Sequence, residues 1–192
     1  MANVNKPFGL RPLGNLSATG AQKQYSYVIA DNQSGAIFQG DLVTIVAGFL
    51  VKFVEASHTS AVGVFNGCTY VDPTSGKPTW SNYYPGSVNI TTGQILAEVL
   101  DDPNQLFIVQ SATTPTQASI GLNAPITAGT SGSVVSGVSN MTIGAATATA
   151  ATSMKIVGLY NSPSNEMGQY AVLVVKINEH LYGSAGTAGM AS

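Results

Sequence analysis

Residues 95–110 read ILAEVLDDPNQLFIVQ, two short apolar runs on either side of an acidic turn that contains a proline. The turn is Asp-Asp-Pro-Asn at positions 101–104, where Pro103 restricts its own φ and Asp102 and Asn104 suit the neighbouring turn positions. Each run is shorter than a typical helix, and the β-branched and aromatic residues of the second run favour a strand. The pattern predicts a β-hairpin, and we expect this hairpin to form the centre of an all-β body.

Similar short apolar runs recur along the chain and are separated by Gly, Pro, Asn and Asp. They predict strands over residues 25–29, 42–46, 49–55, 62–65, 155–160 and 170–178, of which the last is apolar on both faces and is expected to be central. The dipeptide Asn66-Gly67 is compatible with a tight turn, which makes residues 68–71 a return strand, or with a bulge inside one strand. About nine to eleven strands and no long helix predict a jelly-roll-like antiparallel sandwich or barrel.

Three segments differ in composition from this β body. Residues 1–20 alternate apolar residues with Gly and Pro, which predicts an extended arm that docks on its own body or on a neighbour. Residues 128–153 are almost entirely Gly, Ala, Ser, Thr and Val, which predicts loop and short edge strand. Residues 183–192 form a small-residue tail that we expect to be flexible. The expected organisation is therefore an arm over 1–20, a single β domain over 21–182, and the tail.

Charge excludes several classes of partner. Only 8% of the 192 residues are charged, against about 25% in a typical soluble domain, and the net charge is -2. The seven basic residues are spread singly, so we expect no nucleic-acid binding. No apolar run is long enough to span a bilayer, and the N-terminus has no signal sequence, so we expect synthesis in the cytoplasm and no membrane contact. A surface with so few charges is compatible with an ordinary neutral exterior or with burial against other subunits.

The sequence offers little catalytic chemistry. There are two histidines, His58 and His180, and no nucleophile-elbow or phosphate-loop motif. A zinc site needs three or four ligands, and the single Cys68 with two distant histidines does not supply them. The acidic pair Asp101-Asp102 is typical of a turn. We therefore expect a structural protein with no enzymatic activity, no metal and no cofactor.

Two segments are candidates for contact with a partner. The first is the arm, with Lys6, Pro7, Phe8, Leu10, Arg11, Pro12 and Leu13, where Arg11 suits a carboxylate or a backbone carbonyl. The second is an aromatic cluster, Trp80, Tyr83 and Tyr84, which we expect on irregular backbone. Trp and Tyr are enriched at protein interfaces, although the same cluster could also cap one end of the core.

The segment Phe8-Gly9-Leu10-Arg11-Pro12 resembles the arm motif of the capsid decoration (cement) proteins of tailed bacteriophages. Later segments resemble the same family in the same order: residues 101–103 with 106–110, residues 121–124, and residues 155–159, 165–168 and 175–180. The family often continues with basic residues after the arm proline, whereas this chain continues Leu13-Gly14-Asn15. The resemblance covers residues 7–181, nearly the whole chain.

The resemblance implies a jelly-roll-like subunit on the outside of an icosahedral head, in the virion. Its partners would be the phage major capsid protein and further copies of itself, as a homodimer or homotrimer at a local symmetry axis. A second hypothesis is a carbohydrate-binding or host-adhesion β module, because β-sandwiches with exposed aromatic side chains often stack on sugars. An enzyme of jelly-roll type is disfavoured by the missing metal-binding histidines, and a tail or fibre subunit is a further alternative.

Overall fold

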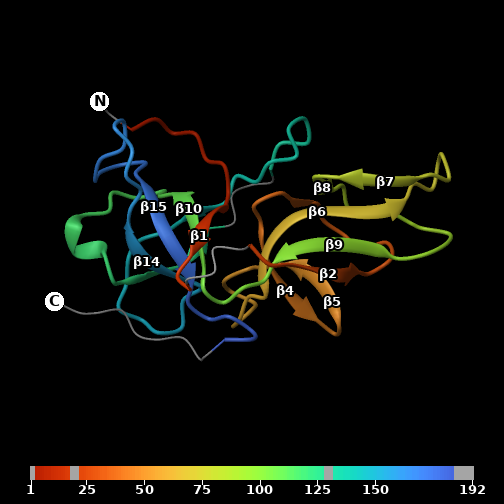
Figure 1. Cartoon of the computed structure of the whole chain (residues 1–192), viewed down its shortest axis with the longest axis horizontal. Helices are drawn as coiled ribbons and strands as arrows, with labels where there is room; N and C mark the ends of the chain where they lie inside the picture. Colours follow the sequence, from red (N-terminus) through yellow and green to blue (C-terminus); the bar gives the residue numbers. More distant parts are fainter. Residues whose placement is uncertain (1–2, 18–21, 128–131, 184–192) are drawn as a thin grey trace.

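The chain folds into several antiparallel β-sheets with almost no helix (Figure 1). The structure is a computed structural model, and it describes residues 3–17, 22–127 and 132–183. Fifteen strands and one three-residue 3-10 helix, Gln117–Ser119, occur in these ranges. The predicted all-β fold is confirmed, and the jelly-roll connection pattern stays a prediction. Parts of the predicted arm, of the segment 128–153 and of the tail lie outside the described residues.

One half of the elongated molecule is a six-stranded sheet in the order β2-β9-β6-β4-β5, with β7 paired to β6 (Figure 1). Its strands are β2 (Gln24–Ile29), β4 (Leu42–Val46), β5 (Phe49–Lys52), β6 (Gly63–Val71), β7 (Pro78–Ser81) and β9 (Ile95–Leu100). The two end strands, β2 and β5, are in contact, so the sheet curls towards a barrel. A short pair, β3 (Ile37–Phe38) with β8 (Tyr83–Tyr84), lies beside it. The core enclosed here includes Phe65, Tyr84 and Val99.

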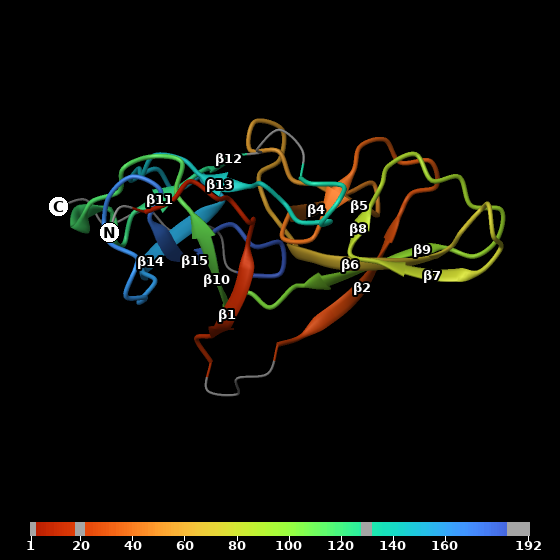
Figure 2. The ribbon, with the colours of Figure 1, turned by 90° about the horizontal axis from the view of Figure 1, so that it is seen from above.

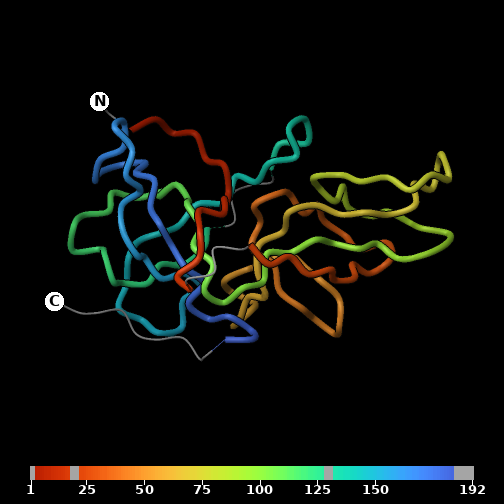
Figure 3. The backbone as a smooth tube through the Cα atoms, in the orientation of Figure 1, coloured from red at the N-terminus to blue at the C-terminus, as the bar shows by residue number. Residues whose placement is uncertain are grey.

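The other half is a five-stranded sheet in the order β1-β10-β15-β14-β11. Its strands are β1 (Arg11–Asn15), β10 (Gln105–Gln110), β11 (Asn123–Ala124), β14 (Met154–Leu159) and β15 (Val172–Ile177), and the pair β12 (Ile126–Thr127) with β13 (Thr142–Ile143) completes it. β15 is the middle strand, as predicted. The smooth trace in Figure 3 follows the chain as it passes between the two halves.

The predicted hairpin over residues 95–110 is wrong in its pairing, although both of its strands and its turn form. β9 lies between β2 and β6, whereas β10 lies between β1 and β15, in the other sheet (Figure 2). The turn is made by Gln105 N–H, which donates to Asp102 O at 3.0 Å, and by Asn104 N–H, which donates to Asp102 Oδ1 at 2.8 Å. Each strand pairs on both sides with strands distant in sequence, so the turn carries the chain from one sheet into the other.

Two further predictions are settled by strand pairing. Asn66-Gly67 is a bulge inside β6, because the register against β9 shifts between Phe65 and Gly67, so residues 68–71 are not a separate return strand. The aromatic cluster lies on regular strands, β7 and β8, and not on irregular backbone. The partner of the bulge, β9, and the partner of β8, β3, lie far away in sequence, whereas β7 pairs with the preceding strand β6.

Polar contacts from the end of β5 fasten the two halves together. Glu55 follows β5, and its carboxylate accepts hydrogen bonds from Ile126 N–H at 2.9 Å and from Ser153 N–H at 3.0 Å. The Ser153 hydroxyl also donates to Glu55 Oε2 at 2.5 Å. Ile126 and Ser153 belong to the half that contains the five-stranded sheet, so this one side chain joins both halves of the molecule.

We expect Glu55→Ala to lower the free energy of unfolding by about 2 kcal/mol, because the buried Ser153 N–H loses its acceptor while Ile126 N–H keeps only the Ser153 hydroxyl. Glu55→Gln keeps one acceptor oxygen, so its free energy of unfolding should lie between those of Glu55→Ala and the wild type. Urea unfolding followed by tryptophan fluorescence measures the difference. Equal stability of all three proteins would contradict the assigned role.

The chain beyond β15 also joins the halves and places a buried histidine at the junction. Ala61 N–H donates to Glu179 O at 2.9 Å and Leu181 N–H donates to Ala61 O at 2.8 Å, so residues 179–181 run beside Ala61. His180 is 5% exposed, and its Nδ1 accepts a hydrogen bond from Tyr182 N–H at 3.1 Å. Burial lowers the pKa of His180 below its usual value, and the opposing effect of Asp101 and Asp102 is smaller.

Stability should therefore fall as the pH drops below about 6.5, the ordinary pKa of histidine, because the unfolded chain binds a proton there before the folded chain does. In His180→Asn, whose Oδ1 replaces Nδ1 as acceptor, the loss of unfolding free energy between pH 7.5 and 5.5 should be smaller than in the wild type. Burial raises the pKa of Glu179, and this shift stabilises the folded protein as the pH falls. Because Glu179 is present in both proteins, the test compares the slope of unfolding free energy against pH in His180→Asn with that in the wild type. Identical slopes would contradict the prediction.

Candidate contact surface

The arm docks on the chain's own body through a close approach of two glycines. Leu10 is 1% exposed, and its N–H donates to Gly40 O at 2.9 Å. Gly9 has φ +70, and a Cβ there would lie 2.6 Å from Ser139 Cβ and 2.8 Å from Gly40 O. Gly40 has φ +92, and a Cβ on it would lie 3.2 Å from the Leu10 backbone. Only glycine at position 9 lets the arm lie this close, which explains the glycine of the Phe8–Pro12 motif.

The rest of the described arm is fixed on both sides of Leu10. The Gln110 side chain donates to Val4 O at 2.8 Å and accepts from Lys6 N–H at 3.0 Å. After Leu10 the chain becomes β1, the outermost strand of the five-stranded sheet, paired to β10. The register shifts between Pro12 and Gly14, so Leu13 is a bulge residue and is 43% exposed. Of the two open alternatives for the arm, the structure of the single chain shows docking on its own body.

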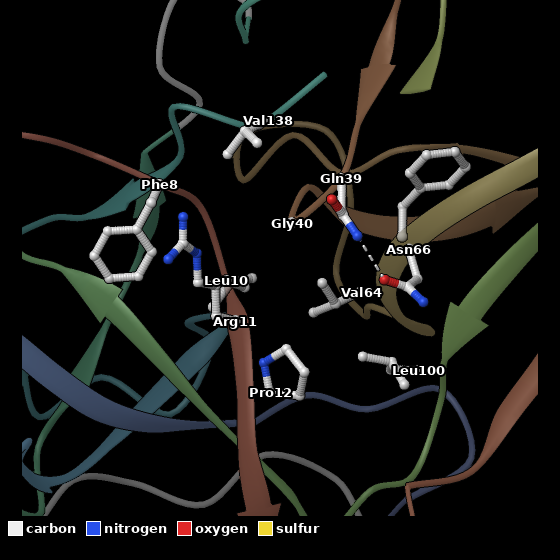
Figure 4. Close-up of a pocket in the computed structure, with 11 residues that line it drawn as sticks. Phe8, Leu10, Arg11, Pro12, Gln39, Gly40, Val64, Asn66, Leu100 and Val138 are labelled. Carbon is white, nitrogen blue, oxygen red and sulfur yellow. Dashed lines mark hydrogen bonds between the residues drawn. The ribbon is translucent and has the colours of Figure 1, made fainter. Parts of the chain in front are cut away.

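A cleft of about 380 Å³ lies between the arm and the six-stranded sheet (Figure 4). The arm side of the cleft is formed by Phe8, Leu10, Arg11 and Pro12, and the other sides by Gln39, Gly40, Val64, Phe65, Asn66, Leu100 and Val138. The Gln39 amide donates to Asn66 Oδ1 at 2.9 Å. The Arg11 guanidinium lies 4.6 Å from the centre of the Phe8 ring, a cation–π contact. The described residues that line the cleft include this cation and no acidic side chain.

The sequence candidates separate into exposed and buried residues. Lys6, Arg11, Pro12 and Leu13 are exposed on the arm, and Pro7 and Phe8 are half-buried. Leu10 belongs to the core of the chain, and so does Tyr84, whose hydroxyl donates to Gln33 O at 3.0 Å. We therefore remove these two side chains from the candidate contact surface, because they reach no partner in this fold.

The structure does not bring the aromatic cluster to the arm. Trp80 is 55% exposed on β7, whereas the Tyr83 ring stacks on Phe38 with ring centres 5.5 Å apart. None of the three aromatic residues lines the cleft. The cluster thus divides into an exposed residue, Trp80, and two tyrosines at the end of the core. The tyrosines fit the interpretation as a cap on the core, and the contact interpretation stays a prediction for Trp80.

The cleft residues outside the arm were not found from the sequence. Gly40 and Asn66 stand next to turn-like signals, but nothing in the sequence shows that they face the arm. Asp41 was also missed: it is fully buried, pairs with Lys52 Nζ at 3.0 Å and accepts a hydrogen bond from Ser139 Oγ at 2.5 Å. Because Ser139 also packs on Gly9, the ion pair between the half-buried Lys52 and the buried Asp41 supports the surface against which the arm lies.

Other reactive groups have structural partners. His58 Nδ1 accepts a hydrogen bond from Val54 N–H at 2.9 Å, and burial raises the pKa of the Cys68 thiol to about 12. Within the described ranges, no cluster of three or more His, Cys, Asp or Glu is arranged to hold a metal ion. In those same ranges no helix has the length and apolar character to cross a membrane.

The fold and the cleft define an all-β protein that carries a docked N-terminal arm. No family model, no curated protein and no solved structure matches the chain.

We expect Gly9→Ala to lower the free energy of unfolding by about 2 kcal/mol or more, because it combines an unfavourable positive φ with a steric clash. Gly48→Ala is the matched control: Gly48 has φ +85 but open space around its Cβ position, so only the backbone strain of about 1 kcal/mol applies. Urea unfolding measures both variants, and hydrogen exchange of the Leu10 amide reports on the arm. A loss for Gly9→Ala no larger than that for Gly48→Ala would show that the close approach is unimportant.

Proposed function

We propose that this protein is a structural virion protein, a cement protein that binds the outside of a phage head and bridges neighbouring major capsid proteins. It would be made in the host cytoplasm, act without catalysis or cofactor, and bind as a homodimer or homotrimer with jelly-roll-like topology. The observation that carries the proposal is the arm: exposed Lys6, Arg11, Pro12 and Leu13 stand on a segment that the chain's own sheet already holds in place. The resemblance of the Phe8–Pro12 motif to the arm of the decoration proteins supports the same function.

A pre-ordered arm suits a bridging subunit for a thermodynamic reason. A contact segment whose backbone is already ordered loses less conformational entropy on binding than a flexible one does. A subunit that contacts two capsid proteins buries area only in the closed shell, and therefore shifts the equilibrium towards that shell. Each contact can be weak, because an oligomer binds through several of them at once.

The contact is expected to use side chains and not the edge of β1. Pro12 has no N–H to donate, and the bulge at Leu13 interrupts the edge that another strand would pair with. The exposed groups are two cations and two apolar side chains, which suit a capsid surface that offers carboxylates beside apolar residues. Because the rest of the chain carries few charges, Lys6 and Arg11 would contribute a large share of the charge on this surface.

The test uses two exposed bulge residues of the same sheet. Leu13 is 43% exposed at the bulge of β1, and Val157 is 39% exposed at the bulge of β14. Leu13→Asp should weaken binding to purified capsids lacking this protein by tenfold or more, about 1.4 kcal/mol, whereas Val157→Asp should bind as the wild type does. Occupancy is measured by gel densitometry and by electron microscopy of the particles.

If both variants occupy the capsid as fully as the wild type, the arm is not the contact. If the wild-type protein does not bind capsids at all, the proposed function is wrong. Deletion of the whole arm is a poorer test, because Leu10 belongs to the core and its loss would destabilise the fold.

A further inference from the structure

The indole of Trp80 packs against the backbone of the six-stranded sheet at Gly67. A Cβ built on Gly67 would lie 2.8 Å from Trp80 Cζ2 and 3.1 Å from Cε2, so the ring covers Gly67 directly. Gly67 is buried under it, while Trp80 itself remains 55% exposed. The ring is therefore packed against the sheet at Gly67, and more than half of the Trp80 surface remains open to solvent.

The bulge at Asn66 is what places a glycine under the ring. Before the bulge, Phe65 points inward opposite Val99, and after it Cys68 points inward opposite Ala97. Without the extra residue the alternation of side chains would turn Gly67 inward and Cys68 outward. The bulge thus gives β6 an outward position with no side chain, and the Trp80 ring fills it.

Polar side chains on the same face of the sheet lie near the ring. Glu98 is the partner of Gly67 on β9, and it accepts a hydrogen bond from the Gln24 side chain of β2 at 2.9 Å. Thr69 is the partner of Trp80, and Ser26 is the partner of Glu98 on β2. Cross-strand partners project from the same face of a sheet, so Glu98 and Thr69 stand next to the ring, and Ser26 lies one strand further away.

Among the described residues, three strands next to this sheet layer lie on the side away from this surface. β4, β5 and β8 lie on the other side of the layer formed by β6, β7 and β9 (Figure 2). At the end of the outer face that adjoins the five-stranded sheet, Val64 and its partner Leu100 are buried. Further along the same face, Leu96 is 40% exposed beside Thr69, and Trp80 follows on β7. Adjacent strands are about 4.8 Å apart, so Leu96 on β9 and Trp80 on β7 lie about 10 Å apart across the sheet.

We propose that this face, with Trp80, Thr69, Glu98 and Gln24, binds a saccharide, a function beyond the capsid contact proposed above. The axial C–H bonds of a gluco- or galacto-configured pyranose would pack on the open face of the indole. Its hydroxyl groups would donate to the Glu98 carboxylate and accept from the Gln24 amide and the Thr69 hydroxyl. Leu96 would support a neighbouring sugar ring.

The surroundings of the ring favour a saccharide over a protein partner. The core of a protein interface is depleted in charged residues and rich in clustered aromatic anchors. Here a single ring stands next to a carboxylate that is already hydrogen-bonded to an amide. A rigid aromatic platform with hydrogen-bonding groups at its rim matches a ligand that has one apolar face and a polar edge.

Fluorescence can test this surface alone, because Trp80 is the only tryptophan of the chain. The full-length protein is titrated with maltose, cellobiose and lactose up to about 50 mM, a range that covers the millimolar affinity expected of a single platform. At least one disaccharide should change the tryptophan emission saturably and protect the ring from acrylamide quenching. Nuclear magnetic resonance titration should map the same sugar to the amides of Gly67, Thr69 and Glu98.

Three variants separate this site from general effects. Trp80→Ala should lower the affinity for the disaccharide at least tenfold, as measured by nuclear magnetic resonance titration. Glu98→Gln should lower the same affinity several-fold. Tyr25→Ala is the control: Tyr25 is 67% exposed on the same sheet, but it pairs with Val99 and belongs to the opposite face, so binding should be unchanged.

The proposal is overturned if no disaccharide gives a saturable change, or if Trp80→Ala binds as the wild type does. A protein contact would give another result: Trp80→Ala would reduce capsid occupancy as Leu13→Asp is expected to, with no response to sugar. Failure of the capsid assay with intact sugar binding would overturn the cement function alone, so the two proposals are judged separately.

Discussion

The structure depends on the passage of the chain from β9 to β10, where two neighbouring strands join different sheets. Both aspartates of the turn accept hydrogen bonds from strands on either side. Tyr27 of β2 donates its hydroxyl to Asp101 at 2.8 Å, and Asn15 of β1 donates its amide to Asp102 at 2.6 Å. The turn is thus tied to one strand of each sheet. Burial, together with the hydrogen bond to Asp101, raises the pKa of Tyr27, so its hydroxyl stays a donor at physiological pH.

Everything else near the junction follows from that passage. Because β10 leaves the first sheet, its edge is open for β1, and the arm can pair there. Because β1 starts at Arg11, the preceding Leu10 reaches the core shared by the two sheets, where it joins Leu42, Val64 and Leu100. The cleft of Figure 4 is the space left beside this contact, and Gly9 sets how closely the arm approaches.

The two proposed surfaces have different physical origins. The arm surface comes from a segment that is extended and rich in proline and is ordered by pairing and by burial of one leucine. The Trp80 surface comes from a bulge, which changes the alternation of β6 and leaves a flat place for an indole. Each depends on a glycine, and in each the glycine is needed because another group lies directly against its backbone.

Local residue patterns determined the strands but not their partners. Apolar runs, turn residues and low charge were sufficient to predict an all-β chain, the strand Leu42–Val46 and the central place of β15. The Asp-Pro-Asn turn was also correctly expected. The sequence likewise offered a bulge as one of two interpretations of Asn66-Gly67. These features depend on neighbours within a few residues, which is the range over which propensity and alternation act.

Tertiary structure alone decided which strands pair, and with that the sites. A hairpin and a crossover between sheets have the same local sequence, and only the burial gained by β9 on β2 and β6, and by β10 on β1 and β15, distinguishes them. For the same reason the sequence could not tell that Tyr84 is buried while Trp80 is open, or that Glu98 stands beside Gly67. Contacts between residues far apart in the chain are set by the packing of whole sheets, and no short segment contains that information.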